Sequence, residues 1–119
     1  MGTRNYKDLI VWQKSMILAT AIYRLTKNFP NEELYGLTNQ LRRAAVSIPS
    51  NIAEGNGRDS YKEYARFLAV ARGSKSEVET QLLLSIELGY LQESEADEAL
   101  NLCAEIGKML NVMISKFRG

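Results

Sequence analysis

The segment from Leu37 to Arg58, LTNQLRRAAVSIPSNIAEGNGR, constrains the fold more than any other part of the chain. Pro49 lies inside a helical pattern, where it removes one backbone hydrogen bond and is predicted to kink the helix near Ala45. Gly55 and Gly57 are predicted to end this helix. Its apolar stripe, which must pack on other elements, contains Leu34, Leu37, Leu41, Ala44, Ala45, Ile48 and Ile52.

A first helix is predicted from about Tyr6 to Asn28, before a turn at Asn28-Phe29-Pro30-Asn31. Asn31 is the predicted N-cap of the second helix, with Glu32 and Glu33 well placed for its dipole. The first helix carries two apolar seams, so it is expected to contact two neighbours, as in a bundle. One seam contains Trp12, Met16, Ala19 and Tyr23, and the other contains Val11, Leu18, Ile22, Leu25 and Phe29.

The third helix is predicted to begin at Asp59 or Ser60, either of which is a good N-cap, and to end at Gly89, with Glu63 completing a capping box with Ser60. Small residues in its middle, Gly73 and Ser74, indicate a close helix crossing or a slight bend. Ser94 is the predicted cap of a fourth helix, which also has two seams. These contain Ala96, Leu100, Cys103, Gly107, Leu110, Ile114 and Phe117, and Ala99, Leu102, Ile106, Met109 and Met113.

No strand pattern, internal repeat or linker interrupts this series of helices. The sequence therefore predicts an all-α protein, an antiparallel up-down-up-down four-helix bundle with short loops. With 119 residues, of which 45% are hydrophobic, residues 1–119 are expected to form one domain with one core.

Composition excludes several kinds of site. Histidine is absent and Cys103 is the only cysteine, so the commonest general base and metal ligand are missing and no disulfide can form within the chain. We therefore expect no cofactor and no metal. We also expect no catalytic residues, because the one candidate, Glu54, is a lone carboxylate without an acid–base partner. The polar start MGTRNYKDL and the shortness of the apolar run from Met16 to Ile22 predict a cytoplasmic protein with no membrane association.

Charge is unevenly distributed, although the net charge is only +1. Residues 77–105 contain eight acidic residues and no Lys or Arg, whereas residues 37–76 hold seven basic residues against three acidic ones. Arg58, Lys62 and Arg66 recur every four residues and so share one face of the third helix. The predicted nucleic-acid-binding residues are Arg42, Arg43, Arg58, Lys62, Arg66, Arg72 and Lys75.

The charge pattern leaves two other interpretations open. Acidic and basic faces on one protomer also suit docking between subunits, and basic residues on a helix often form only a solvated surface. Tyr61 and Tyr64 can stack on bases, but at helical spacing packing is the better interpretation. The apolar surplus on the first and fourth helices predicts a subunit interface near Trp12, Tyr23 or the Met109 and Met113 seam.

Three stretches resemble one known family. These are ELYGLTNQLRRAAVSIPSNIAEGNGR, KEYARFLAVARGSKSEVETQLLL and LGYL, within a likeness that extends from Tyr6 to about Phe117. The chain resembles the bacterial four-helix-bundle proteins encoded within 23S rRNA intervening sequences, also labelled S23 ribosomal protein. That family has no established biochemical activity, and its ribosomal label reflects genetic location.

The same family also looks related to the accessory protein of diversity-generating retroelements. That accessory protein is a barrel-like pentamer that binds nucleic acid together with a reverse transcriptase. The resemblance therefore implies a homo-oligomer, a pentamer, with RNA or DNA as a partner. The function expected is that of a non-enzymatic accessory protein that contacts nucleic acid, with a protein-binding assembly scaffold as the alternative.

Overall fold

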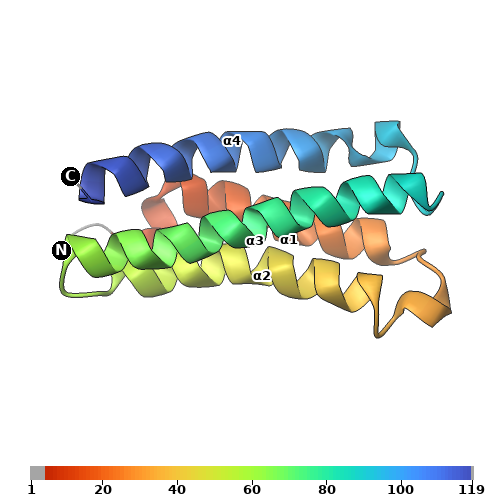
Figure 1. Ribbon diagram of the computed structural model, residues 1–119, viewed down its shortest axis with the longest axis horizontal. Coiled ribbons are helices and arrows are strands. Elements are labelled where there is room, and N and C mark those ends of the chain that lie inside the picture. Colours follow the sequence, from red (N-terminus) through yellow and green to blue (C-terminus); the bar gives the residue numbers. More distant parts are fainter. Residues whose placement is uncertain (1–4, 119) are drawn as a thin grey trace.

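The computed structural model describes residues 5–118, which form four α-helices and no strand. The helices are α1 (Ile10–Thr26), α2 (Leu37–Asn56), α3 (Tyr61–Glu87) and α4 (Glu93–Arg118), with short 3₁₀ turns at Tyr6–Asp8 and Asn31–Glu33. They pack into a bundle of 44 × 23 × 20 Å (Figure 1). The predicted all-α four-helix class is confirmed. Residues 1–4 of the polar start and Gly119 lie outside the described range.

Each helix packs on its neighbours in sequence, and α4 closes the bundle against α1. Residues 57–60 join α2 to α3, and residues 88–92 join α3 to α4. Such connections span at most about 3.5 Å per residue, whereas α3 is about 40 Å long. α3 must therefore fold back along α2, and α4 along α3, and Figure 1 shows all consecutive helices running in opposite directions.

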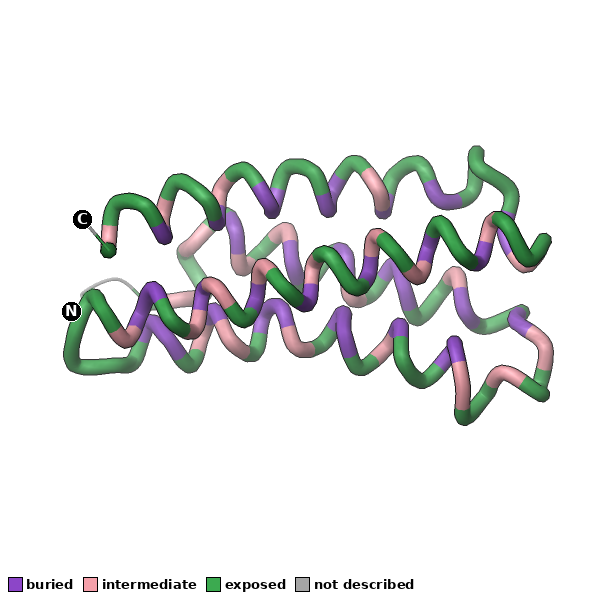
Figure 2. The backbone as a smooth tube through the Cα atoms, viewed as in Figure 1, coloured by how far each residue is buried: buried purple, intermediate pink, exposed green. Residues whose placement is uncertain are grey.

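The core lies along the inward stripes of all four helices (Figure 2). On α1 it includes Val11, Leu18 and Ile22, so the predicted seam containing them faces the core. In the other predicted seam, Met16 and Tyr23 are 43% and 46% exposed and Trp12 is only partly buried. One seam of α1 therefore remains on the surface of the protomer. The largest fully buried side chains include Leu18, Ile22, Leu41, Ile48, Ile52, Leu68, Leu82, Ile106 and Leu110.

The start predicted for the first helix was wrong by four residues. The Asn5 side chain accepts a hydrogen bond of 2.9 Å from the Lys7 N–H and forms a separate 3₁₀ turn at Tyr6–Asp8. Leu9 is then extended, with φ −74° and ψ 126°, before α1 begins at Ile10. A side chain that bonds nearby backbone groups competes with the helix in this way.

The start predicted for the second helix was also wrong. Asn31 begins a 3₁₀ turn, and α2 begins at Leu37 after Gly36. Glu33 caps it instead, because its carboxylate accepts hydrogen bonds from the Leu37 N–H at 3.1 Å and the Tyr90 hydroxyl at 2.9 Å. Leu34, placed in the buried stripe by periodicity, falls in the connection and is 48% exposed.

The start of α3 was predicted correctly, and the helix ends at Glu87, two residues before the predicted Gly89. The Ser60 hydroxyl accepts a hydrogen bond of 3.1 Å from the Glu63 N–H, as a cap requires. At the other end Gly89 has φ +79°, which a side chain would disfavour. Its N–H donates to the Ile86 carbonyl and the Tyr90 N–H donates to the Ser85 carbonyl, which is a Schellman motif.

The predicted Ser94 cap was wrong, because α4 begins at Glu93. The Glu95 carboxylate accepts a hydrogen bond of 2.9 Å from the Gln92 N–H, so the acidic first turn supplies the cap. Pro49 lies buried within α2, which continues from Leu37 to Asn56. The kink at Pro49 stays a prediction.

The closest backbone approach of α2 and α3 involves Gly55, and of the predicted pair Gly73 and Ser74 only Ser74 contacts α2, through the 2.8 Å bond between its hydroxyl and that of Ser47. A Cβ atom on Gly55 would lie 2.8 Å from Phe67 Cβ and 3.3 Å from the Tyr64 carbonyl oxygen. A Cβ atom on Gly73 would meet nothing within 4 Å. Small size is therefore required at Gly55, where two helices meet, and is not required at Gly73.

These two glycines give a matched pair of substitutions. Gly73→Ala should stabilise the protein by about 0.5–1 kcal/mol, because alanine is the better helix former and the site is open. Gly55→Ala should destabilise it by about 1–3 kcal/mol, because α2 and α3 must separate. Urea unfolding followed by circular dichroism measures both changes, and a gain of stability in both variants would contradict this packing.

Candidate nucleic-acid interface

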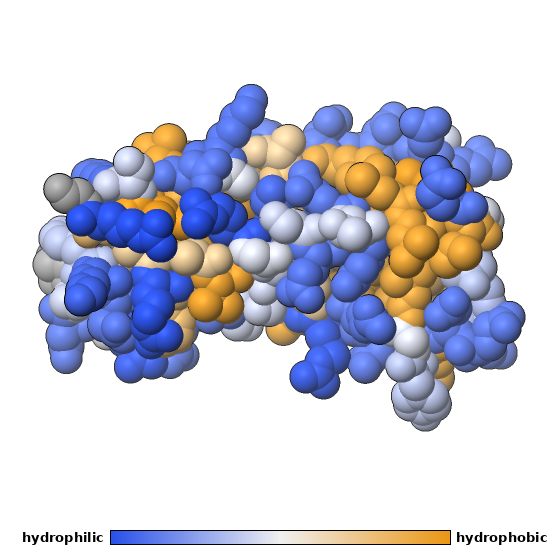
Figure 3. All heavy atoms as spheres, in the orientation of Figure 1, coloured by the Kyte–Doolittle hydropathy of each residue, from blue (hydrophilic) through white to orange (hydrophobic). Residues whose placement is uncertain are grey.

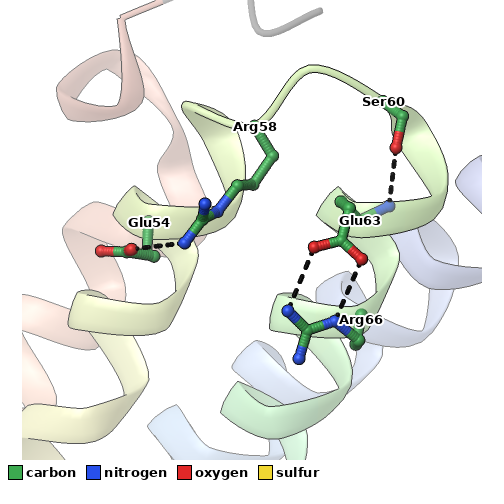
Figure 4. Close-up of polar contacts among 5 residues, drawn as sticks. All are labelled: Glu54, Arg58, Ser60, Glu63 and Arg66. Carbon is green, nitrogen blue, oxygen red and sulfur yellow. Dashed lines mark hydrogen bonds and ion pairs between the residues drawn. The ribbon is translucent and has the colours of Figure 1, made fainter.

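Arginine side chains at the start of α3 are held in place by carboxylates and by one aromatic ring. Arg58 Nη2 donates to Glu54 Oε1 at 2.7 Å, and Arg66 binds both oxygens of Glu63, at 3.2 and 3.1 Å (Figure 4). The guanidinium groups of both arginines also lie 4.7 Å from the centre of the Phe67 ring. Phe67 therefore provides a shared support for two cations.

The electrostatics of Glu63 show that these cations act together. The hydrogen bond from Arg66 lowers the pKa of Glu63, outweighing desolvation, and the charges of Arg66, Arg58 and Lys62 lower it further. The same carboxylate raises the pKa of Arg66 through that hydrogen bond. Both ion pairs lie at the surface, where such pairs contribute little to stability and are weakened by salt. A phosphate can therefore replace either carboxylate at small cost.

A recess of about 430 Å³ opens beside these residues, and a fourth cation lines it. Its walls are Lys62, Glu63, Arg66, Ala69 and Arg118, the last from the end of α4. Lys62 and Arg118 form no ion pair with any residue in the range 5–118. We call Arg58, Lys62, Arg66 and Arg118 the cationic end group, and Figure 3 shows strongly hydrophilic side chains over this end of the bundle.

The other four predicted residues lie elsewhere on the bundle. Arg42 Nε donates to Thr26 Oγ1 at 2.9 Å and its guanidinium lies 4.7 Å from the Tyr23 ring, so it joins α2 to α1. Arg72 donates to Asn111 Oδ1 of α4 at 3.0 Å. Arg43 is exposed on α2.

Lys75 is largely inaccessible to a ligand. Its side chain is only 14% exposed and its Nζ lies 2.9 Å from Glu79 Oε1. Its aliphatic stem covers Gly107, where an added Cβ would lie 3.1 Å from Lys75 Cε. The structure thus groups three of the seven predicted cations and adds Arg118, which the sequence analysis missed. The only signal for Arg118 was a basic residue in the last turn of a helix.

The remaining candidates have structural roles. Tyr61 and Tyr64 stack on the Phe117 ring, with ring centres 4.9 and 4.7 Å apart. Glu54 is held by Arg58. Cys103 is buried among apolar side chains. Within residues 5–118, no three acidic or cysteine side chains come together as metal ligands would.

No helix within residues 5–118 combines the length and the hydrophobicity that a membrane crossing requires.

A sequence model of the 23S rRNA-intervening sequence protein family matches residues 7–112. The chain belongs to this family. Its fold is similar to the crystal structure of a protein of unknown function from the S23 ribosomal protein family of Bacteroides thetaiotaomicron. The TM-score is 0.79 at 27% sequence identity, over 88% of this chain and 98% of the other. No curated protein sequence shows significant similarity to the chain. The family resemblance read from the three sequence stretches is confirmed.

The buried thiol of Cys103 should be unreactive in the folded protein. Desolvation raises its pKa from 9.0 to about 12, so the thiolate that reacts with disulfide reagents is scarce at pH 8. We expect Ellman's reagent to label the native protein only as fast as it unfolds, and to label it at once in denaturant.

The same shift has a pH-dependent consequence. The contribution of the neutral thiol to folding is fully present below pH 9 and is lost as pH rises towards 12, because the unfolded chain ionises first. Rapid labelling of the native protein at pH 8 would show that Cys103 is not in the apolar core.

Proposed function

We propose that this protein is a non-enzymatic accessory protein that assembles with copies of itself and contacts the phosphates of RNA or DNA through the cationic end group. The observation that carries the proposal is the convergence of Lys62, Arg66 and Arg118 on one recess, with Arg58 beside it. Proteins bind phosphate oxygens with the planar guanidinium group of arginine and with the ammonium group of lysine.

Contacts of this kind position nucleic acid without reading its sequence. We therefore expect binding to depend steeply on salt and little on base composition at this end of the bundle. The overall net charge of +1 does not oppose such a site, because exposed charges beyond about 8 Å are screened at physiological salt.

Self-assembly is supported by an apolar groove between the beginning of α1 and the last turns of α4. The groove has a volume of about 510 Å³ and contains both methionines of the predicted seam. Two of its side chains, Ile10 and Val112, are 60% and 69% exposed. The apolar part of its lining is Leu9, Ile10, Val11, Met109, Val112 and Met113.

The alternative is a protein-binding assembly scaffold with no nucleic-acid role. It is favoured by further exposed leucines near the opposite end of α3, Leu83, Leu84 and Leu88, which are 47–53% exposed. Figure 3 shows hydrophobic surface over that end of the bundle. The two interpretations differ in whether the cationic end group is available to phosphate.

Charge reversal tests the nucleic-acid role. Lys62→Glu with Arg118→Glu should abolish binding of a fluorescent single-stranded RNA in anisotropy titrations. Replacing both by Gln should lower the slope of log K against log salt by about 1.4, the loss of two phosphate contacts. The matched control is Arg24→Glu with Lys27→Glu, which changes net charge equally at the opposite end of the molecule and should bind more strongly than the first variant.

Two results would contradict the nucleic-acid role. One is that the native protein has no salt-sensitive affinity for single-stranded or structured RNA, or for DNA. The other is that both charge-reversed variants lose affinity equally, which would show a general charge effect.

Assembly is tested by placing a charge in the groove. Val112→Glu should reduce the oligomer to a smaller species in size-exclusion chromatography with light scattering, because a buried unpaired carboxylate opposes association. Asn101→Glu, at an exposed α4 position outside the groove, is the control and should leave the mass unchanged. A native protein that is monomeric at micromolar concentration would refute assembly.

A further inference from the structure

We propose that the hollow between α2 and α3 is a binding pocket for guanine, supplied either as a free nucleotide or as a base of bound RNA. The RNA source rests on the proposed function, whereas the free-nucleotide source does not. The pocket has a volume of about 360 Å³, within the roughly 300–1,000 Å³ typical of small-molecule sites. Its polar lining consists of Gln40, Arg43, Ser47, Ser74, Glu77 and Gln81.

One side chain of the lining carries a hydrogen-bond acceptor that has no donor. Gln81 lines the pocket, and its Oε1 is buried and makes no hydrogen bond to any residue in the range 5–118. Beside it the hydroxyls of Ser47 and Ser74 bond to each other at 2.8 Å, and Asn51 Nδ2 donates to Ser47 Oγ at 3.0 Å. A buried carbonyl oxygen without a donor is unfavourable, and a ligand N–H group that bonded to Gln81 Oε1 would remove that penalty.

The rim of the pocket has one cation and one anion. Arg43 on α2 and Glu77 on α3 both line it and both are exposed. They form no ion pair with each other or with any other residue of the described range. Arg43 thus offers donors from α2 and Glu77 offers acceptors from α3, whereas the Ser and Gln side chains of the lining can do both. A ligand that pairs with both charged groups has acceptors on one edge and donors on the next.

Guanine has this arrangement on adjacent edges of its ring. Its O6 and N7 are acceptors that arginine binds with two hydrogen bonds. Its N1–H and 2-amino group are adjacent donors that a carboxylate binds in the same way, and the 2-amino group has a second hydrogen for Gln81 Oε1. Adenine lacks the adjacent pair of donors. Hypoxanthine lacks only the 2-amino group.

The pocket and the cationic end group lie on one face of α3. Arg66 and Glu77 are separated by almost exactly three helical turns, about 16 Å along the axis. Between them Gly73 is exposed with nothing near its missing Cβ, so no side chain there blocks a strand. A chain of about five nucleotides at 3.4 Å each spans this distance. Phosphates at the end group therefore leave a base within reach of the pocket.

Calorimetric titration of the full chain with nucleotides tests the pocket directly. GMP should bind about tenfold or more tightly than IMP, which differs only by the 2-amino group, since a bidentate contact discriminates by at least that much. Glu77→Gln should reduce GMP binding to the level of IMP. Glu87→Gln removes a carboxylate elsewhere on α3 and is the control that should keep the preference.

A second set of titrations uses eight-nucleotide RNAs and separates the two sources of guanine. If RNA supplies it, a guanine-containing oligonucleotide should bind more tightly than oligouridine, and Glu77→Gln should remove only that difference. If free nucleotide supplies it, the protein should still prefer GMP to IMP, but oligonucleotides should bind weakly or not at all. That result would contradict phosphate binding by the cationic end group and would support the guanine pocket. The Lys62→Glu, Arg118→Glu variant should retain GMP selectivity in both cases.

Three results would overturn the pocket as a guanine site. The first is equal binding of GMP and IMP, or no binding of either. The second is a GMP preference that Glu77→Gln leaves intact while its unfolding curve matches the native protein. The third is that free serine or glutamine binds at this pocket and nucleotides do not. That result would show that the charged groups at the rim bind an amino acid.

Discussion

The close contact between α2 and α3 is the constraint on which the rest of the molecule depends. Near one end Gly55 lets Tyr64 and Phe67 pack directly against α2. Further along, the hydroxyls of Ser47 and Ser74 meet at 2.8 Å. Because Phe67 supports Arg58 and Arg66, the first contact positions two of the four cations of the end group. The second contact forms part of the lining of the polar pocket. A single helix–helix interface therefore positions both candidate sites, and a change that separates α2 from α3 would disturb both.

Periodicity predicted the helices and most of the core because burial repeats with the helical turn. The helix ends were less predictable, because several side chains compete for the same unpaired backbone groups. Asn31 and Ser94 are good caps by residue type, yet Glu33 and Glu95 make the bonds. Glu33 also binds Tyr90, far away in sequence, and local preference contains no information about that contact. Ser60, with no such competitor, caps α3 as predicted.

The candidate interface was predictable to the extent that it lies within one helix. The spacing of Arg58, Lys62 and Arg66 placed them on one face without any knowledge of the fold. Arg118 reaches the same recess only because α4 returns along α3, which sequence spacing cannot show. Likewise, sequence alone could not tell which glycine lies at a helix contact: Gly55 does and Gly73 does not. The polar pocket was missed since each of its side chains, taken alone, is typical of a solvated surface.

The distribution of charge links assembly to binding. Five of the eight acidic residues between Glu77 and Glu105 lie around the connection from α3 to α4, at the end of the bundle opposite the cationic end group. Two copies placed head to tail would bring these opposite charges together, and a phosphate backbone would compete for the same cations. The lining of the apolar groove of α1 and α4 contains none of the four cations of the end group. Assembly through the groove is therefore compatible with phosphate binding. Assembly through the charged ends is not, because the cations that contact the acidic end of another copy can no longer bind phosphate. Salt separates the two cases, because it weakens a charged contact and strengthens apolar burial.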